Sequence, residues 1–265
     1  MYSNLAVPLI ILLLFSSCSV CEDRALCPCL LAFDFALLDT AAVMASGDST
    51  LCWHVSFFHR LHSGNSEGLL PVINLPGRYE LEIPRDSVNV AVVVGDEGLY
   101  LPYAGLIVPE GCEFPRLWLS AHTIDASGDA VTDTVLLRKE HALVYLHMKR
   151  SSVQSSDCSL SGGTAGCDAR GCPVSGPYRV DLQPDGKGRC QACVPRQSDD
   201  SLRLDILWRD GQRRSLPIGY YLADSGYDWT APDLEDIVVE VDYALTSVTI
   251  STDSWKRTLS FTIVV

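Results

Sequence analysis

The sequence is short of positive charge and of catalytic signatures. It has 20 Lys and Arg residues against 33 Asp and Glu residues, a formal net charge of −13, and no local basic cluster offsets that balance. Such a chain repels a phosphate backbone, so we expect no nucleic-acid partner. Nucleophile elbow, phosphate-binding loop and zinc-protease signature are all missing, and the run Gly162 to Gly166 lacks the lysine of a phosphate loop and is interpreted as a linker.

The amino terminus has the pattern of an export signal. Leu5 to Phe15 form an apolar run of 11 residues, too short to span a bilayer and the right length for a signal-peptide core. Ser16 and Ser17 precede Cys18, as in a bacterial lipobox, where the thiol is lipidated and the chain is cut before it. We therefore expect residues 1–17 to be removed and Cys18 to carry the lipid. The alternative is an ordinary signal, with Cys18 removed or left free.

The cysteine count supports export. The chain has 11 cysteines, an odd number, and assigning Cys18 to a lipid leaves ten, enough for five disulfides in an oxidising compartment. The sequence leaves their connectivity open, although Cys27 and Cys29 cannot easily close on each other across one proline. The candidates are Cys21, Cys27, Cys29, Cys52, Cys112, Cys158, Cys167, Cys172, Cys190 and Cys193.

Two groups of residues invite a metal interpretation that we do not favour. Cys167, Cys172, Cys190 and Cys193 are spaced loosely like a four-thiolate zinc site, but an exported protein is expected to oxidise them. His54, His59 and His62 cannot all point to one side of a strand. We therefore predict no metal site and no cofactor.

The chain beyond the signal predicts an all-β fold. Tyr79 to Ile83 alternate apolar and polar residues after a Pro-Gly turn, and Val88 to Val94 are nearly all β-branched, which predicts a strand covered on both faces. The sequence predicts a hairpin from Val131–Leu137 and Ala142–Met148, and one short helix over Ala36–Ala45. Further strands are predicted over Leu30–Phe35, Trp53–Phe58, Leu69–Asn74, Leu202–Trp208, Ser215–Leu222, Ile237–Tyr243, Ser247–Ser251 and Leu259–Val265.

A change in composition near residue 149 predicts two domains. Residues 18–148 would form one β-sandwich and residues 149–265 a second, each of typical sandwich size. Ser, Gly, Asp and Cys dominate the segment 151–200, which we expect to be an insertion in the second domain, a loop held by disulfides.

Three stretches together resemble one protein family. They are Cys27–Phe35, a Cys-Pro motif running into a strand; Val135–Leu146, a strand, a basic turn and a second strand; and Asp228–Trp229 with Leu234–Ala244, Val248–Ile250 and Trp255. With the lipobox, this order resembles the FimB-like fimbrial anchor lipoproteins of Bacteroides-type bacteria, which lie at the base of type V pili. The resemblance does not extend to the Cys-rich segment.

The resemblance implies both fold and function. It implies two tandem transthyretin-like antiparallel β-sandwich domains and a non-enzymatic, surface-exposed lipoprotein that holds a fimbria (pilus) on the outer membrane, with fimbrial subunits as partners. Pilus subunits of this class polymerise by strand exchange: proteolysis removes a subunit's first strand, and a neighbour's carboxy-terminal strand fills the groove. We expect this chain to keep its first strand, Leu30–Phe35, and so not to accept a donor.

The last strand has the alternation that strand exchange needs. Leu259, Phe261, Ile263 and Val265 alternate with polar residues up to the end of the sequence. Such a segment can be donated to a neighbour or can close its own sheet, and the sequence leaves both open.

Other functions remain as alternatives. A surface glycan-binding lipoprotein of the nutrient-uptake type would need exposed tryptophans among Trp118, Trp208, Trp229 and Trp255, although core positions are favoured. A stalk or tip pilus subunit would have lost its first strand. A zinc enzyme built on the Cys-rich segment is the weakest alternative.

Overall fold

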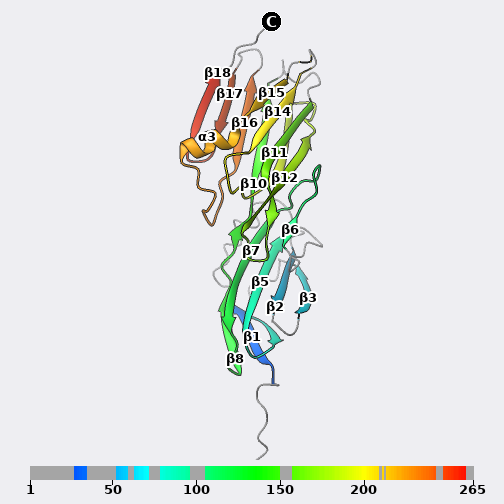
Figure 1. The fold of residues 1–265 in the computed structure, drawn as a ribbon, viewed down its shortest axis with the longest axis vertical. Coiled ribbons are helices and arrows are strands. Elements are labelled where there is room, and N and C mark those ends of the chain that lie inside the picture. The colour runs from blue at the N-terminus through cyan, green and yellow to red at the C-terminus, as the bar shows by residue number, and fades with distance from the viewer. Residues whose placement is uncertain are drawn as a thin grey trace, which may run out of the picture.

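The computed structural model describes residues 27–34, 52–58, 63–71, 78–95, 105–149, 157–208, 211, 213–242 and 247–260, and for 52–58, 63–71, 78–79 and 260 it describes the backbone only. The expected signal peptide, Cys18, Cys21 and the helix expected over 36–45 lie outside the described residues. Strands dominate, as predicted, and Figure 1 shows them in an elongated molecule with the early strands at one end and the late strands at the other.

The N-terminal half is built from two sheets. Three strands pair in the order β4-β1-β8, and five in the order β3-β2-β5-β7-β9. Their bounds are β1 Cys29–Asp34, β2 Cys52–Phe58, β3 Ser63–Pro71, β4 Arg78–Ile83, β5 Ser87–Gly95, β7 Leu117–Asp125, β8 Ala130–Thr134 and β9 Arg138–Lys139. A core that includes Phe33, Ile83, Val90, Val92 and Trp118 fills the space between the two sheets.

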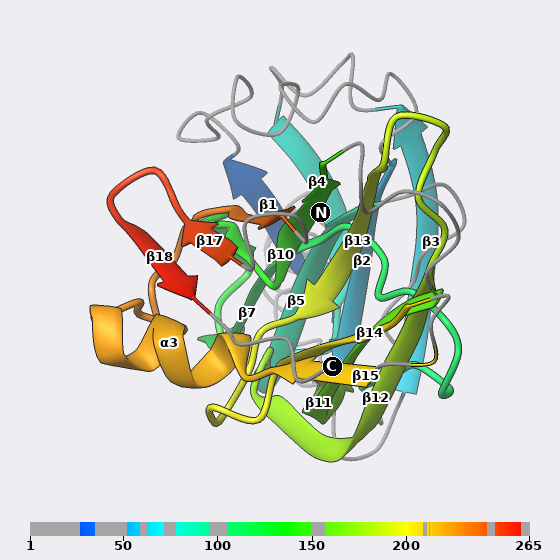
Figure 2. The same ribbon diagram turned by 90° about the horizontal axis from the view of Figure 1, so that it is seen from above.

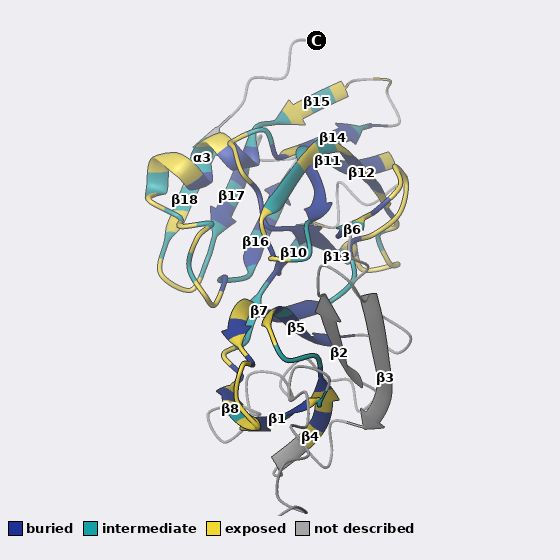
Figure 3. Cartoon of the chain, turned by 60° about the horizontal axis from the view of Figure 1, so that its bottom comes forward, coloured by how far each residue is buried: buried dark blue, intermediate teal, exposed yellow. Residues whose placement is uncertain are grey.

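The C-terminal half is a second, larger sandwich. One sheet has the order β12-β11-β14-β15, with the short β6 also paired to β11, and the other has the order β13-β10-β16-β17-β18. Their bounds are β6 Leu106–Ile107, β10 His141–Met148, β11 Asp157–Cys167, β12 Pro173–Leu182, β13 Arg189–Pro195, β14 Arg203–Leu207, β15 Arg213–Leu216, β16 Ile237–Asp242, β17 Ser247–Ser251 and β18 Lys256–Ser260. Their inner faces share one core, seen as dark blue in Figure 3.

The all-β sandwich prediction is therefore confirmed, with one addition: two strand pairs are parallel. β1 runs parallel to β8, and β10 runs parallel to β16, while every other described pair is antiparallel. The transthyretin-like topology stays a prediction.

β5 has both faces covered, as its β-branched composition predicts. Val90 and Val92 belong to the core of the N-terminal half, whereas Ala91 and Val93 join the core cluster that continues into the C-terminal half. A strand that is buried on both faces needs an uninterrupted apolar run, which explains its sequence.

The hairpin predicted around Arg138–His141 is wrong. β8 pairs with β1, whereas β10 pairs with β13 and β16, so the two strands belong to different halves. Apart from the short β6, which already pairs with β11, the change from one set of sheets to the other consequently falls between β9 and β10. The boundary expected at 148/149 thus assigned β10 to the wrong set of sheets.

The Cys-rich segment is not a loop insertion in its described part. β11, β12 and β13 are regular strands that carry core residues such as Leu160 and Val180. The glycine run is a bulged part of β11, with register shifts between Gly162 and Gly166. At Gly166 a Cβ would lie 1.8 Å from the backbone oxygen of Leu106, so the glycine permits β6 to pair there.

The strand predicted over Ser215–Leu222 ends early and becomes a helix. β15 stops at Leu216, and α3 runs over Ile218–Ser225 after Pro217, which cannot donate to a strand ladder. Ile218 and Leu222, four residues apart, bury one face of α3, and Gly226 ends it in the left-handed conformation. None of the helices described here has the length and apolarity needed to cross a membrane.

Candidate functional site

The first candidate site is the groove between β4 and β8 that β1 occupies in the N-terminal half. β1 is a central strand: Leu31 lies opposite Leu81 of β4 on one side and Val131 of β8 on the other. Leu31 and Phe33 have no exposed surface. Outside the regular ladder, the Leu30 amide donates to the Asp129 carbonyl at 3.0 Å and the Val135 amide to the Asp34 carbonyl at 3.2 Å.

The position between β4 and β8 has the properties of a groove that accepts an added strand. Removing β1 would leave the facing backbone groups of β4 and β8 unpaired and would open an apolar trench above Val90 and Val92. Each fully buried side chain of this size contributes roughly 1.5–3 kcal/mol. An extended segment with alternating apolar residues is the kind of ligand that such a groove accepts.

The second candidate site is the edge strand β18. Among the described strands, β18 is the last in its sheet and pairs only with β17, where Leu259 lies opposite Val248. Leu259 is half-buried against the core, so up to Ser260 this strand closes its own sheet. The strand begins at Lys256, earlier than predicted. Phe261, Ile263 and Val265, the other predicted donor residues, lie outside the described residues.

Helix α3 supports this edge. Figure 2 shows α3 beside β18. The Arg257 guanidinium of β18 forms an ion pair with Asp224 of α3 and lies 5.3 Å from the ring centre of Tyr221. These contacts hold β18 in place, and none of the described strands pairs with its outer backbone edge.

A buried ion cluster joins the two halves. Glu140 is buried and accepts from Arg138 Nε at 2.5 Å and from Arg196 Nε at 3.2 Å. Arg196, directly after β13, is also buried and donates to the backbone oxygens of Lys139, Trp229 and Ala231. Burial raises the pKa of Glu140, while the two guanidinium groups oppose that shift. Sequence reasoning missed this cluster, because Arg138–His141 looked like an exposed basic turn.

His141 lies beside the cluster and is buried as well. Its Nδ1 is 3.1 Å from both the backbone nitrogen and the backbone oxygen of Leu117, and its ring meets Trp118 edge-on at 4.8 Å. Burial is the main cause that lowers its pKa to about 4, so the ring is neutral at pH 7. We assign it a packing role at the junction.

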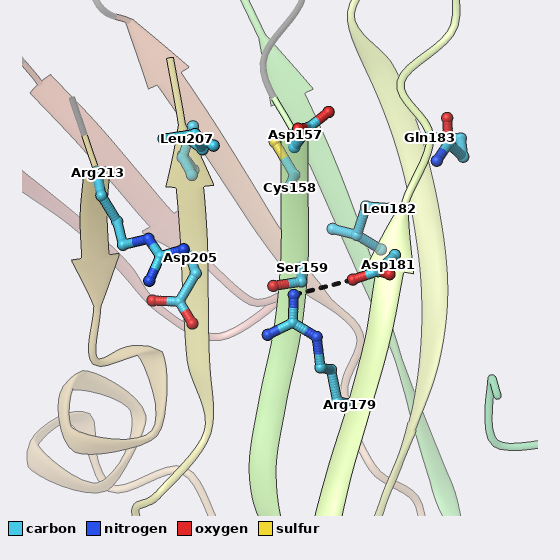
Figure 4. A pocket seen from close by; sticks show the side chains of 11 residues that line it. Asp157, Cys158, Ser159, Arg179, Asp181, Leu182, Gln183, Asp205, Leu207 and Arg213 are labelled. Carbon is cyan, nitrogen blue, oxygen red and sulfur yellow. Dashed lines mark hydrogen bonds and ion pairs between the residues drawn. The ribbon is translucent and has the colours of Figure 1, made fainter. Parts of the chain in front are cut away.

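The outer face of β12-β11-β14-β15 carries a charged pocket. Arg179 forms an ion pair with Asp181 at 3.1 Å, drawn as a dashed line in Figure 4, and Arg213 points toward Asp205. Both arginines and Asp181 are exposed, and no aromatic ring lines the pocket. Alternating charges of this kind are typical of a solvated strand face, and they offer no platform on which a sugar could stack.

The predicted cysteines lie in different environments. Cys52 starts β2, and only its backbone is described. Cys29, Cys158, Cys167 and Cys193 are buried, Cys27 and Cys190 are half-buried, and Cys112 and Cys172 are exposed. Among the residues described, no group of three or more His, Cys, Asp or Glu could hold a metal ion, so the four-thiolate alternative has no site there. The predicted disulfides stay predictions.

The tryptophans favour core positions. Trp118 and Trp208 are each 6% exposed, and Trp229 and Trp255 pack against the core of the C-terminal half. The exposed aromatic face that a glycan-binding lipoprotein would need is therefore missing from these four positions.

Comparison with known proteins places the whole chain in one fold. No protein-family model and no curated sequence matches it. Solved structures match along nearly the full length. A candidate polysaccharide-binding protein of Bacteroides thetaiotaomicron is 14% identical, covers 88% of this chain and 98% of its own, and has a TM-score of 0.59. A candidate adhesin of Bacteroides ovatus is 13% identical, with 88% and 95% covered and a TM-score of 0.58.

A third similar structure is the fimbrial anchor protein Mfa2 of Porphyromonas gingivalis. It is 11% identical, covers 87% of this chain and 99% of its own, and has a TM-score of 0.56. At such identities the likeness concerns the fold. The chain thus shares its fold, almost from end to end, with a fimbrial anchor protein and a candidate adhesin, as the resemblance in its sequence implied.

Proposed function

We propose that this protein is a surface-exposed outer-membrane lipoprotein that anchors a fimbria, takes part in adhesion through it, and is not an enzyme. Cys18 carries the lipid, and fimbrial subunits are its partners. The fold shared with a fimbrial anchor protein supports this proposal, as does the lipobox. The observation that carries it is the seated β1, with Leu31 and Phe33 fully buried.

Whether β1 is retained in the mature protein would separate an anchor from a polymerised subunit. A stalk subunit that accepts a donor must have an empty groove, whereas here the groove between β4 and β8 is filled by the chain itself. A subunit with a filled groove can end a pilus at its base but cannot accept a further donor there.

The two candidate sites lie at opposite poles. β1 is at the lower end of the molecule in Figure 1 and β18 is at the upper end. The lipid would be attached 11 residues before Cys29, a span of at most about 40 Å. Tethering near β1 therefore keeps the N-terminal half at the membrane and presents the open edge of β18 outward, where a fimbrial subunit can pair with it.

A deletion strain tests the proposal. Cells without the protein should assemble pili and shed them into the medium, and a plasmid with the native sequence should restore attachment. Cys18→Ala should leave pili in the medium, whereas the control Leu136→Ala, at an exposed side chain, should restore attachment. Unchanged pili together with lost growth on a glycan would contradict anchoring and favour the glycan-binding alternative.

A further inference from the structure

Two cysteines in different sheets of the C-terminal half face the same part of its core. Cys158 is near the start of β11, where it pairs with Leu182 of β12 and Ile206 of β14, and it is 3% exposed. Figure 4 shows it on β11 with Leu182 on the neighbouring strand. Cys190 is on β13 in the opposite sheet, opposite Leu146 of β10.

The alternation along β13 sets the direction of Cys190. Cys190 and Ala192 lie on one face, where their partners on β10 are Leu146 and Val144, both members of the core. Gln191 lies on the other face with its partner Tyr145, and both line a surface pocket. Cys190 therefore points toward β11, the strand that carries Cys158.

Met148 lies close to both cysteines. The Cys158 thiol lies 3.8 Å from the Met148 sulfur, which reaches across from β10. Met148 is on the same face of β10 as Leu146, the partner of Cys190, and its amide donates to the Gly188 carbonyl at 2.7 Å, two residues before Cys190. The pKa of Cys190 is raised to about 12, by burial first and by Cys158 second, which is consistent with two neighbouring thiols.

Strand geometry argues against a bond between Cys158 and Cys167 and against one between Cys190 and Cys193. Cys167 is at the far end of β11, nine residues and about 30 Å from Cys158 along the same strand. Cys193 lies three residues from Cys190, on the opposite face of β13, and its carbonyl accepts from the Tyr178 hydroxyl at 2.7 Å.

We propose that Cys158 and Cys190 form a disulfide that links the two sheets of the C-terminal half. The bond joins β11 to β13 across the core and replaces the contact of Cys158 with Met148. It joins residues 32 positions apart, and it stabilises the fold chiefly by restricting the unfolded chain. A subunit that carries the pull of a pilus gains a sandwich whose two sheets are covalently joined.

The reaction needs an oxidant, which is a disulfide of an export-compartment thiol oxidoreductase. A thiolate attacks that disulfide and forms a mixed disulfide, and the second thiolate then displaces the oxidant. Each cysteine loses one proton and one electron, and the oxidant leaves as a dithiol. Because burial opposes thiolate formation in the folded chain, the bond forms before the sandwich closes. The oxidising compartment rests on the proposed export, whereas the pairing rests on the geometry.

Peptide mapping of the full-length protein tests the pairing. Protein extracted from the cell envelope is alkylated with N-ethylmaleimide in denaturant without reductant, then digested with trypsin and chymotrypsin, since cleavage after Leu160 separates Cys158 from Cys167. We expect a peptide with Cys158 linked through Cys190 to the peptide ending at Arg196. The same protein refolded in a glutathione buffer is mapped in parallel.

The outcomes separate the pairing from the location. In one outcome both cysteines are alkylated in the envelope sample but linked after refolding. That result overturns the bond in the native protein and contradicts an oxidising compartment. Linkage of either cysteine to another partner in both samples overturns the pairing alone. Absence of the linkage in both samples also overturns it.

Variants give a second readout. Cys158→Ala and Cys190→Ala should each lower the Tm by roughly 5–10 °C, and the double variant should be little worse than either. Reductant should lower the Tm of the native chain and of the exposed-position control Leu136→Ala by the same amount, while the Tm of the double variant should fall less, because one of its bonds is already missing. Additive losses in the double variant, with unchanged sensitivity to reductant, would contradict the bond.

Discussion

Each half of the molecule contains one strand with the same arrangement of neighbours. β1 lies between antiparallel β4 and parallel β8, and β10 lies between antiparallel β13 and parallel β16. The halves differ in what surrounds that strand. In the C-terminal half the sheet continues through β17 and β18, whereas in the N-terminal half the described sheet ends at β8.

This difference shows why the two strands have different functional possibilities. β10 is in the middle of the chain and is joined at both ends to packed elements, so one cut cannot free it. β1 is the first of the described strands, and a single cut after Asp34 would separate it from the other described strands of its sandwich. Only the N-terminal half can therefore be converted from a filled to an open groove, and in our proposal the anchor keeps it filled.

The largest expected effect comes from the core contact of β1. Phe33→Ala should lower the free energy of unfolding of the N-terminal half by about 4 kcal/mol, because it leaves a cavity at a fully buried position. Leu146→Ala on β10 should act on the C-terminal half instead. Hydrogen exchange resolved by mass spectrometry reads the two halves separately, and Leu136→Ala, at a side chain 64% exposed, serves as the control.

If Phe33→Ala loosened both halves equally, the halves would form one cooperative unit and the comparison would fail. Protection lost only around β4, β8 and β5 would support it.

Breaking the buried ion cluster should have the next largest effect. Arg196→Met leaves Glu140 buried with fewer partners and removes donors to three backbone oxygens, which should cost about 3 kcal/mol. Adding Glu140→Gln should recover part of that loss. Urea unfolding of the single and double variants measures both values, and a double variant that is much less stable than Arg196→Met would contradict a paired cluster.

The pH dependence of stability should be smaller. The pKa of His141 is lowered from 6.5 to about 4 in the folded chain, chiefly by burial. Between these values the unfolded chain takes up a proton that the folded ring does not, so stability should fall as the pH drops, by at most about 3 kcal/mol. Urea unfolding at about pH 7 and about pH 5 measures this, and His141→Phe should show a smaller fall. An equal fall in the variant would assign the effect to other groups.

The smallest effect is expected at the open edge. Arg257→Ala removes the ion pair with Asp224 and the contact with Tyr221, both at an exposed position, and should cost about 0.5–1 kcal/mol. Its thermal melting should hardly change, yet pili should attach less well if β18 is the pairing edge. Arg179→Ala, on the charged outer face of β12, is a matched control that should leave attachment unchanged.

Local patterns predicted individual strands well. The alternation of Tyr79–Ile83 and the β-branched run at Val88–Val94 correspond to β4 and β5, and β17 has the predicted bounds. These strands are specified by residues that are adjacent in sequence, so periodicity is enough to find them.

Strand pairing and side-chain burial could not be predicted from local sequence patterns in the same way. The order Val131–Leu137, turn, Ala142–Met148 favours a hairpin, but β8 gains more by pairing with β1, 100 positions away in the Leu30–Ala130 register. The charged Glu140 is buried only because Arg138 and Arg196 reach it from two segments. Ser and Gly in β11 suggested a loop because their packing partners lie in other strands.

The amino-terminal state of the native protein tests the central claim most directly. Intact-mass and terminal-sequence measurement on protein from the outer membrane should find a chain that begins at Cys18, is acylated there and still contains Cys29–Asp34. A chain that begins beyond Asp34, or one whose first residue carries no lipid, would contradict an anchor that keeps its first strand.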